Sequence, residues 1–348
     1  MTLQLIPFEP ELLPQAGELL ARRQRRDRAI FPELPARFED KAVAQQAIEA
    51  ALARKHAHGF AALENGRLLA YLIGDIVIDN VWGRAGWVRL AGCAYDPAAG
   101  VEPVRDLYAA LGEQWVKYGV FFHFGLMTVA DPDLIQAWFS LSFGLEQVHA
   151  LIDLEALKPT LPATPPDIEI RRVGPADGPH LAALSDVIWR VQVKAPVWAV
   201  MMPETVAGTE ASWADLVDEP EAIVWLALID GKPVALQGYW PAETGSDQLH
   251  IPEQCVHLSV AGTHPAARGR GLNTLLTQYG LAQAQAAGYR FCEIDWRSAN
   301  LLASRFWPKQ GFRPVVYRLA RRLDPRIAWA TGVGGKSKWN SWNSEIDP

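Results

Sequence analysis

Two arginines and two glycines stand directly before a helix-like segment in the second half of the chain, as Arg268, Gly269, Arg270 and Gly271. Apolar residues recur at helical spacing from Leu272 onward. Glycines let a backbone approach a bulky anion closely, and the first N–H groups of a helix carry partial positive charge. Arginines add charge-assisted hydrogen bonds to phosphate. The pattern predicts a pyrophosphate-binding loop; an exposed turn with two solvated arginines is the alternative.

The loop belongs to neither of two common nucleotide-binding classes. It lacks the GxxxxGK[ST] sequence of nucleotide triphosphatases, and it also lacks GxGxxG. What precedes it is the strand-like stretch CVHLSVAGT, which begins at Cys255. The element order is therefore a strand, a basic glycine loop and a helix.

The loop resembles the signature of the GNAT acetyltransferase superfamily, Q/R-x-x-G-x-G/A, which follows a strand and opens a helix. Five of the six positions conform, and Asn273 departs where Gly or Ala is usual. A second family block, N-x-x-A-x-x-x-Y-x-x-x-G-F, is similar to the stretch that runs from Asn300 to Phe312, about thirty residues further on. The resemblance spans roughly residues 168–324, and the two motifs together are more specific than either alone.

The resemblance implies that acetyl-CoA is the cosubstrate and that an amine attacks it directly, with no metal and no covalent enzyme intermediate. A backbone N–H of the strand before the loop would polarise the thioester carbonyl. The residues implied to bind the cofactor are the strand residues Ala261, Gly262 and Thr263, the loop residues Arg268, Gly269, Arg270, Gly271, Leu272 and Asn273, and the second-block residues Asn300, Ala303, Phe306 and Trp307.

The groups that would move protons are less clearly marked. Trp307 stands where the family most often has the tyrosine that protonates the departing thiolate, and an indole N–H cannot release a proton near neutral pH. An attacking amine also needs a base. The candidates are His257, on the strand before the loop, and Glu253, just ahead of that strand; Glu293 and Asp295 on the following strand are weaker candidates.

Three landmarks recur along the chain at nearly constant spacing. The turn signals Asn65-Gly66 and Asp230-Gly231 each separate two strand-like runs, at an offset of 165, and both dipeptides favour hairpins. Asp96-Pro97 and His264-Pro265 differ by 168, and Gly144 and Gly311 by 167. One fold therefore occurs twice. We expect two tandem GNAT folds of the α/β (α+β) class, each a mixed, mostly antiparallel twisted sheet flanked by helices.

The first copy lacks the phosphate-binding features of the second. After Asp96-Pro97 the chain reads AAGVEPV, so that Glu102 replaces arginine charge and Pro103 removes a donor N–H. Asp133 falls where the repeat would place Asn300. We interpret residues 1–160 as a degenerate GNAT-like domain that braces the second domain and walls the acceptor pocket. Residues 161–167 form a Pro-rich linker, 168–324 the acetyl-CoA-binding domain, and 325–348 a loose tail.

Composition limits the remaining possibilities. With 348 residues, 49% apolar, the chain suits two folded domains, and its net charge of −6 argues against nucleic-acid binding. Glu9 and Glu11 occupy the place of a signal sequence's apolar region, so a cytoplasmic protein without a membrane segment is expected. The three separated cysteines suggest buried thiols, and His56 and His58 have no partner cluster for a metal.

The sequence predicts an N-acetyltransferase that acts on an amine of a small molecule or an exposed protein amine. The alternative is a non-catalytic acyl-CoA-binding or interaction protein, which the tryptophan at position 307 favours. A third reading is transfer of an acyl group longer than acetyl. The sequence carries no signal for the oligomeric state or the identity of the acceptor.

Overall fold

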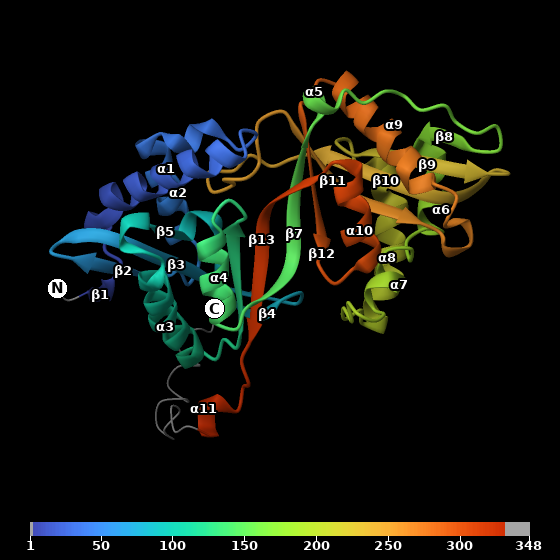
Figure 1. Ribbon diagram of the computed structural model, residues 1–348. Coiled ribbons are helices and arrows are strands. Elements are labelled where there is room, and N and C mark those ends of the chain that lie inside the picture. Colours follow the sequence, from blue (N-terminus) through green and yellow to red (C-terminus); the bar gives the residue numbers. More distant parts are fainter. Residues whose placement is uncertain (1–2, 331–348) are drawn as a thin grey trace. The chain divides into compact units, whose positions relative to one another are not determined.

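The computed structural model describes residues 3–330, which form two compact units (Figure 1). The first unit takes in the chain up to Glu146, the segment Gly245–His250 and the chain from Val315 onward. The second unit consists of Gln147–Thr244 and Ile251–Pro314. Each unit is a mixed sheet with helices packed against it.

The first unit has the strand order β1-β2-β3-β4-β6-β13, with β5 paired to β3, and β4 with β6 is its parallel pair. Its strands are β1 (Gln4–Pro7), β2 (His58–Glu64), β3 (Arg67–Asp79), β4 (Gly83–Val88), β5 (Cys93–Tyr95), β6 (Phe122–Thr128) and β13 (Arg313–Arg322). Its helices are α1 (Leu13–Ile30), α2 (Lys41–Leu52), α3 (Glu102–Lys117), α4 (Pro132–Ser140) and α11 (Ile327–Ala330).

The second unit has the strand order β7-β12-β11-β10-β9-β8, with β11 and β12 as its parallel pair. Its strands are β7 (Gly144–Asp153), β8 (Glu169–Arg172), β9 (Ile223–Ile229), β10 (Lys232–Pro241), β11 (Cys255–Thr263) and β12 (Phe291–Arg297). Its helices are α5 (Leu154–Leu157), α6 (Gly178–Ala182), α7 (Trp189–Gln192), α8 (Pro203–Ala214), α9 (Leu272–Ala286) and α10 (Leu301–Phe306).

Both predicted hairpins are confirmed. Asn65 and Gly66 join β2 to β3 with φ of 52° and 77°, and Asp230 and Gly231 join β9 to β10 with φ of 50° and 69°. Two consecutive positive φ angles are what a two-residue hairpin turn of type I′ requires, and Asn-Gly and Asp-Gly adopt them at low cost. The repeated order of elements, including these hairpins, matches the tandem fold expected from the sequence.

Alternating side chains of β9 cover the two faces of the second sheet. Trp225 meets Tyr279 of α9 edge to face on one side, at 4.9 Å between ring centroids. Leu226, its neighbour, is fully buried on the other side in a cluster with Leu181 and Leu184 from the α6 region. Helices on opposite faces therefore fix the sheet between them, and α9 is held with its N-terminus beside the end of β11.

The last strand of each half of the chain lies in the unit formed mainly by the other half. From Gln147 onward, β7 pairs antiparallel with β12 in the second unit, although the Pro-rich segment around Pro165 lies after it in sequence. From Val315 onward, β13 pairs antiparallel with β6 in the first unit. The domain boundaries expected from the sequence follow chain order and do not contain this exchange of strands.

The remaining sequence expectations concern the cysteines and the tail. Cys93, Cys255 and Cys292 are buried and form no disulfide, as expected. Part of the expected tail forms the short helix α11, and residues 331–348 lie outside the described residues. Within the described part of the chain, no helix is both long enough and apolar enough to cross a membrane.

Candidate functional site: a cleft between β11 and α9

The parallel strands β11 and β12 separate partway along their length. Ladder pairing joins Cys255–Leu258 to residues 291–294, while β11 continues to Thr263. A register shift against β10 follows Leu258, which leaves Ser259 as the extra residue. The backbone of residues 259–263 therefore has no ladder partner on the β12 side. An open strand edge of this kind can pair with the amide groups of an extended ligand.

The glycine loop lies where this open edge ends. Gly269 and Gly271 have φ of 79° and 75°, and a side chain built at either would meet no atom within 4 Å. Gly271 is the N-cap of α9, and no side chain caps the helix. Leu275 makes the first helical hydrogen bond, to the carbonyl of Gly271, so the N–H groups of residues 272–274 point away from the helix with no acceptor among the described residues.

Strand, loop and helix line one cleft of about 400 Å³ in the second unit. Twelve of the thirteen cofactor-binding residues expected from the sequence border it; these are Ala261, Gly262, Thr263, Arg268, Gly269, Gly271, Leu272, Asn273, Asn300, Ala303, Phe306 and Trp307. Arg270 does not border it, because its guanidinium forms an ion pair with Asp167 just ahead of β8.

One wall of the cleft lies outside the two motifs that the sequence marks. Val187, Ile188 and Val191, around the start of α7, border it, and Val187 and Ile188 lie close to Gly262 of β11. A Cβ on Gly262 would lie 2.3 Å from a methyl carbon of Val187, so only glycine fits there. No motif marks these three residues, since their apolar spacing is equally typical of an ordinary core segment.

Asn273, the departure from the family pattern, is anchored to the sheet below. Its side-chain oxygen accepts a hydrogen bond of 2.9 Å from Nε2 of Gln237, a fully buried residue of β10. The same amide group donates to Thr277 Oγ1 at 2.8 Å, and the Tyr239 hydroxyl donates to Gln237 Oε1 at 2.7 Å. This network fixes the first turn of α9 on the sheet.

Asn300 and Trp307 border the cleft from α10 and the turn that follows it. The Asn300 side-chain oxygen accepts hydrogen bonds from the N–H groups of Leu302 and Ala303, at 3.2 and 3.3 Å. Asn300 therefore acts as the N-cap of α10, a role that holds this helix at the cleft. The Trp307 side chain is 5% exposed and packs edge to face against Phe306 and Phe312.

The two candidate bases have different surroundings. His257 is the last but one of the β11 residues that pair with β12, next to the point where the two strands separate. Its Nδ1 is hydrogen-bonded to Glu293 on β12. Burial by itself lowers the pKa of His257, but the hydrogen bond and charge of Glu293 outweigh burial and raise it above the usual value. Glu253 lies on an exposed turn before β11 and does not border the cleft.

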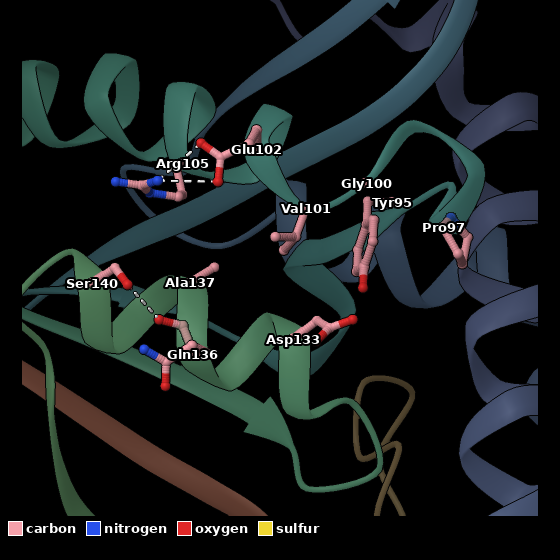
Figure 2. A pocket seen from close by; sticks show the side chains of 10 residues that line it. All are labelled: Tyr95, Pro97, Gly100, Val101, Glu102, Arg105, Asp133, Gln136, Ala137 and Ser140. Atoms are coloured by element: carbon pink, nitrogen blue, oxygen red, sulfur yellow. Dashed lines mark hydrogen bonds and ion pairs between the residues drawn. The ribbon is translucent and has the colours of Figure 1, made fainter.

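A second cleft, of about 250 Å³, occupies the equivalent place in the first unit (Figure 2). It lies between the N-terminal part of α3 and the length of α4, from Asp133 to Ser140, and is bordered by Tyr95 and Gly100. Glu102, at the first position of α3, forms an ion pair of 2.9 Å with Arg105, which Figure 2 shows turned toward it. Asp133 adds a second carboxylate, so the lining carries more negative than positive charge.

The loop of the first unit is also shorter. α3 begins at Glu102, six residues after Asp96, whereas α9 begins at Leu272, eight residues after His264. Asp133, expected from the sequence as the counterpart of Asn300, lies two residues beyond the true counterpart. Asp131, not Asp133, caps α4 and is the structural equivalent of Asn300. Gly144 follows Asp131 by 13 residues, whereas Gly311 follows Asn300 by 11, so the offset of 167 between the two glycines does not hold at the helix caps.

Trp198 is 70% exposed in the segment between α7 and α8 and does not border the cleft. The aromatic residues that do border it, Phe306 and Trp307, come from the second family block.

Comparison with known proteins identifies the class. The model of the acetyltransferase (GNAT) family matches residues 193–312, which include β9 to β12, the glycine loop and α10. Residues 193–312 are therefore similar to acetyltransferases of the GNAT family. No curated protein matches the sequence significantly.

Solved structures show the same fold over nearly the whole chain. A tandem GNAT protein from the clavulanic acid biosynthesis pathway, without AcCoA, is 15% identical with a TM-score of 0.53, covering 92% of this chain and 98% of that one. A GCN5-related N-acetyltransferase from Sphaerobacter thermophilus is 13% identical with a TM-score of 0.56, covering 92% and 95%. The chain is thus a tandem GNAT protein in fold.

Proposed function

We propose that the second unit binds acetyl-CoA and transfers its acetyl group to an amine. The observation that carries the proposal is the direct succession of an open strand edge, a glycine loop and an uncapped helix N-terminus along one cleft. A diphosphate suits the free N–H groups at the helix end, and an amide-bearing arm suits the open edge of β11.

The residues present fit this ligand. The Thr263 hydroxyl oxygen is buried at the cleft with no hydrogen-bond partner among residues 3–330, which is costly unless a ligand supplies one. Space is open above Gly269 and Gly271. When bound, acetyl-CoA would supply an activated thioester.

The chain's own groups would assist the attack of an amine. A free backbone N–H among residues 259–263 stabilises negative charge that develops on the carbonyl oxygen. His257 accepts the proton that the amine loses as its nitrogen bonds to the carbonyl carbon. The carbon–sulfur bond then breaks, and the thiolate leaves with the electron pair. Since a thiol has a pKa of about 8.5, this departure does not require Trp307 to donate a proton.

The first unit has a different part in this proposal. Its shorter loop and the carboxylates of Glu102 and Asp133 disfavour a diphosphate at the equivalent cleft. We assign it no cofactor. The acceptor is an amine of a small molecule or an exposed protein amine.

Two measurements test the function. Isothermal titration calorimetry with acetyl-CoA is expected to give one site per chain, and a thiol-reactive dye is expected to detect CoA release with some member of a panel of amines. Succinyl-CoA and longer acyl-CoA esters in the same titration define the acyl chain. Absence of any binding would contradict the proposal.

One observation favours a second function, non-catalytic binding of acyl-CoA. The residue at the usual position of the proton-donating tyrosine is Trp307, whose indole cannot release a proton near neutral pH. Binding of acetyl-CoA without CoA release for any amine in the panel would select this function over the first.

A further inference from the structure

Three ionisable side chains from three neighbouring strands meet on one face of the second sheet. His257 on β11 lies opposite Glu293 on the parallel strand β12. On the other side of β12, His149 of β7 lies opposite Asp295, one diagonal from Glu293. Side chains at such positions point to the same face and reach one another. His149 comes from the last strand of the first half of the chain.

The carboxylate of Glu293 is shared between the two imidazoles. Its Oε2 is hydrogen-bonded to His257 Nδ1, and its Oε1 lies 3.1 Å from His149 Nδ1. Glu293 is 2% exposed. Burial by itself raises the pKa of Glu293, but the hydrogen bonds from His149 and His257 outweigh burial and hold it well below the usual value. The buried carboxylate is therefore ionised, with one N–H donor on each oxygen.

This arrangement selects one tautomer of His257. An ionised carboxylate can only accept hydrogen bonds, so the Nδ1 that meets it must carry the hydrogen. The lone pair of neutral His257 is then on Nε2, to which no described residue forms a hydrogen bond. Nε2 is the nitrogen that can take a proton from an amine, by the same logic that orients the histidine of a Ser-His-Asp triad.

We propose that His149 is a positioning residue for the transfer reaction: it holds one oxygen of Glu293 so that the other fixes His257 with Nε2 as the proton acceptor. The catalytic consequence rests on the function proposed above. The first half of the chain thus supplies, through β7, part of the proton-transfer apparatus of the second unit. A purely structural ion pair that holds β7 against β12 is the competing role.

Other groups near His257 set the background for a test. Asp295 lies on the same face of β12, where its charge favours protonated His257, and it accepts a hydrogen bond from Gln147 of β7. The neighbouring position on β10 is Trp240, which does not titrate. A change at position 149 leaves the side chains of Asp295 and Gln147 in place.

The test follows the His257 ring by NMR, with ¹⁵N-labelled histidine in the full-length protein without cofactor. In the wild type, His257 is expected as the Nδ1–H tautomer. His149→Leu removes a hydrogen-bond donor from Glu293, so the carboxylate interacts more strongly with protonated His257. The pKa of His257 is therefore expected to rise by about one unit. His149→Asn, whose side-chain N–H can take the place of Nδ1, is expected to restore the wild-type value.

Each outcome decides the matter. An Nε2–H tautomer in the wild type overturns the proposal without any variant. So does an unchanged pKa of His257 in His149→Leu, even when the melting temperature falls, because that combination is the signature of a structural ion pair. If no amine is acetylated while the pKa shift and its rescue are observed, the transferase function fails and the positioning contact stands. With an active enzyme, the acid limb of the kcat/KM profile is expected to move to higher pH in His149→Leu.

Discussion

Gln237, fully buried in β10, donates a hydrogen bond of 2.9 Å to the side chain of Asn273 in the first turn of α9. This contact explains why a residue larger than Gly or Ala stands at that point of the loop. The asparagine side chain is hydrogen-bonded to the sheet.

We expect Asn273→Ala, which creates the residue usual in the family, to destabilise the second unit. Gln237 would lose one acceptor but keep the carbonyl of residue 273 and Thr277 Oγ1, so the loss is about 1 kcal/mol. Urea unfolding followed by tryptophan fluorescence measures it. Affinity for acetyl-CoA is expected to change little, and a large loss would show that the Asn273 side chain contacts the ligand.

We expect Gly271→Val to abolish cofactor binding. A side chain at Gly271 would occupy open space at the helix end where the diphosphate would lie, and valine is strained at φ of 75°. Losing the contacts of that loop is expected to weaken binding at least ~10²-fold, or about 2.7 kcal/mol. Calorimetry measures the affinity, and circular dichroism checks the fold.

Gly100→Val is the matched control. Gly100 has φ of 71° and equally open surroundings in the first unit. It is expected to leave cofactor affinity unchanged. Equal losses in both variants would contradict the assignment of the cofactor to the second unit.

We expect Asp167→Asn to strengthen cofactor binding at low salt. Arg270 is paired with Asp167, and both side chains are about half exposed, so the pair is worth at most about 1 kcal/mol. Freeing Arg270 is expected to lower the Kd up to ~5-fold in 50 mM salt, and added salt is expected to erase the gain. Glu155→Gln, which breaks an exposed pair with Arg290, is the control. Weaker binding would mean that the Asp167 pair shapes the loop.

We expect His257→Gln to lower kcat/KM ~10²-fold without a change in acetyl-CoA affinity, as removal of a general base does. His180→Gln, which alters a histidine paired with Asp177 away from the cleft, is the control. Full activity in His257→Gln would remove the histidine from the mechanism.

The pH dependence gives a separate prediction. A base must be neutral to work, so kcat/KM rises with pH through the pKa of His257, which lies above its usual value of about 6.5 because of Glu293. Glu293→Gln removes that charge and leaves burial, which lowers the pKa. The acid limb is therefore expected to move to lower pH. A shift in the opposite direction would contradict the assignment.

Much of the fold could be predicted from local signals. Asn65-Gly66 and Asp230-Gly231 locate the hairpins because their preference for positive φ does not depend on the rest of the chain. The glycine loop and the start of α9 are predictable for the same reason, because a short local stretch of sequence determines that Gly271 precedes the helix.

The parts that could not be predicted depend on contacts between distant residues. The pairing of Glu293 with His257 follows only from the parallel register of β11 and β12, and its contact with His149 follows only from the exchange of strands. Val187 borders the cleft because its segment packs on Gly262. No sequence pattern predicts this contact. The shift from Asp133 to Asp131 reflects a difference of two residues between the stretches Asp131–Gly144 and Asn300–Gly311, which an offset of constant size cannot reveal.

Through the pairing of β7 with β12, the first half of the chain completes the sheet of the second unit, although its own cleft is acidic. Cutting the protein at the Pro-rich segment would remove β7 and leave β12 as an edge strand with unpaired peptide groups. Exposed edge strands of this kind promote aggregation. A gene fragment encoding only the family-matched portion is therefore a poor candidate for recombinant production, whereas the intact chain carries its own protective strand.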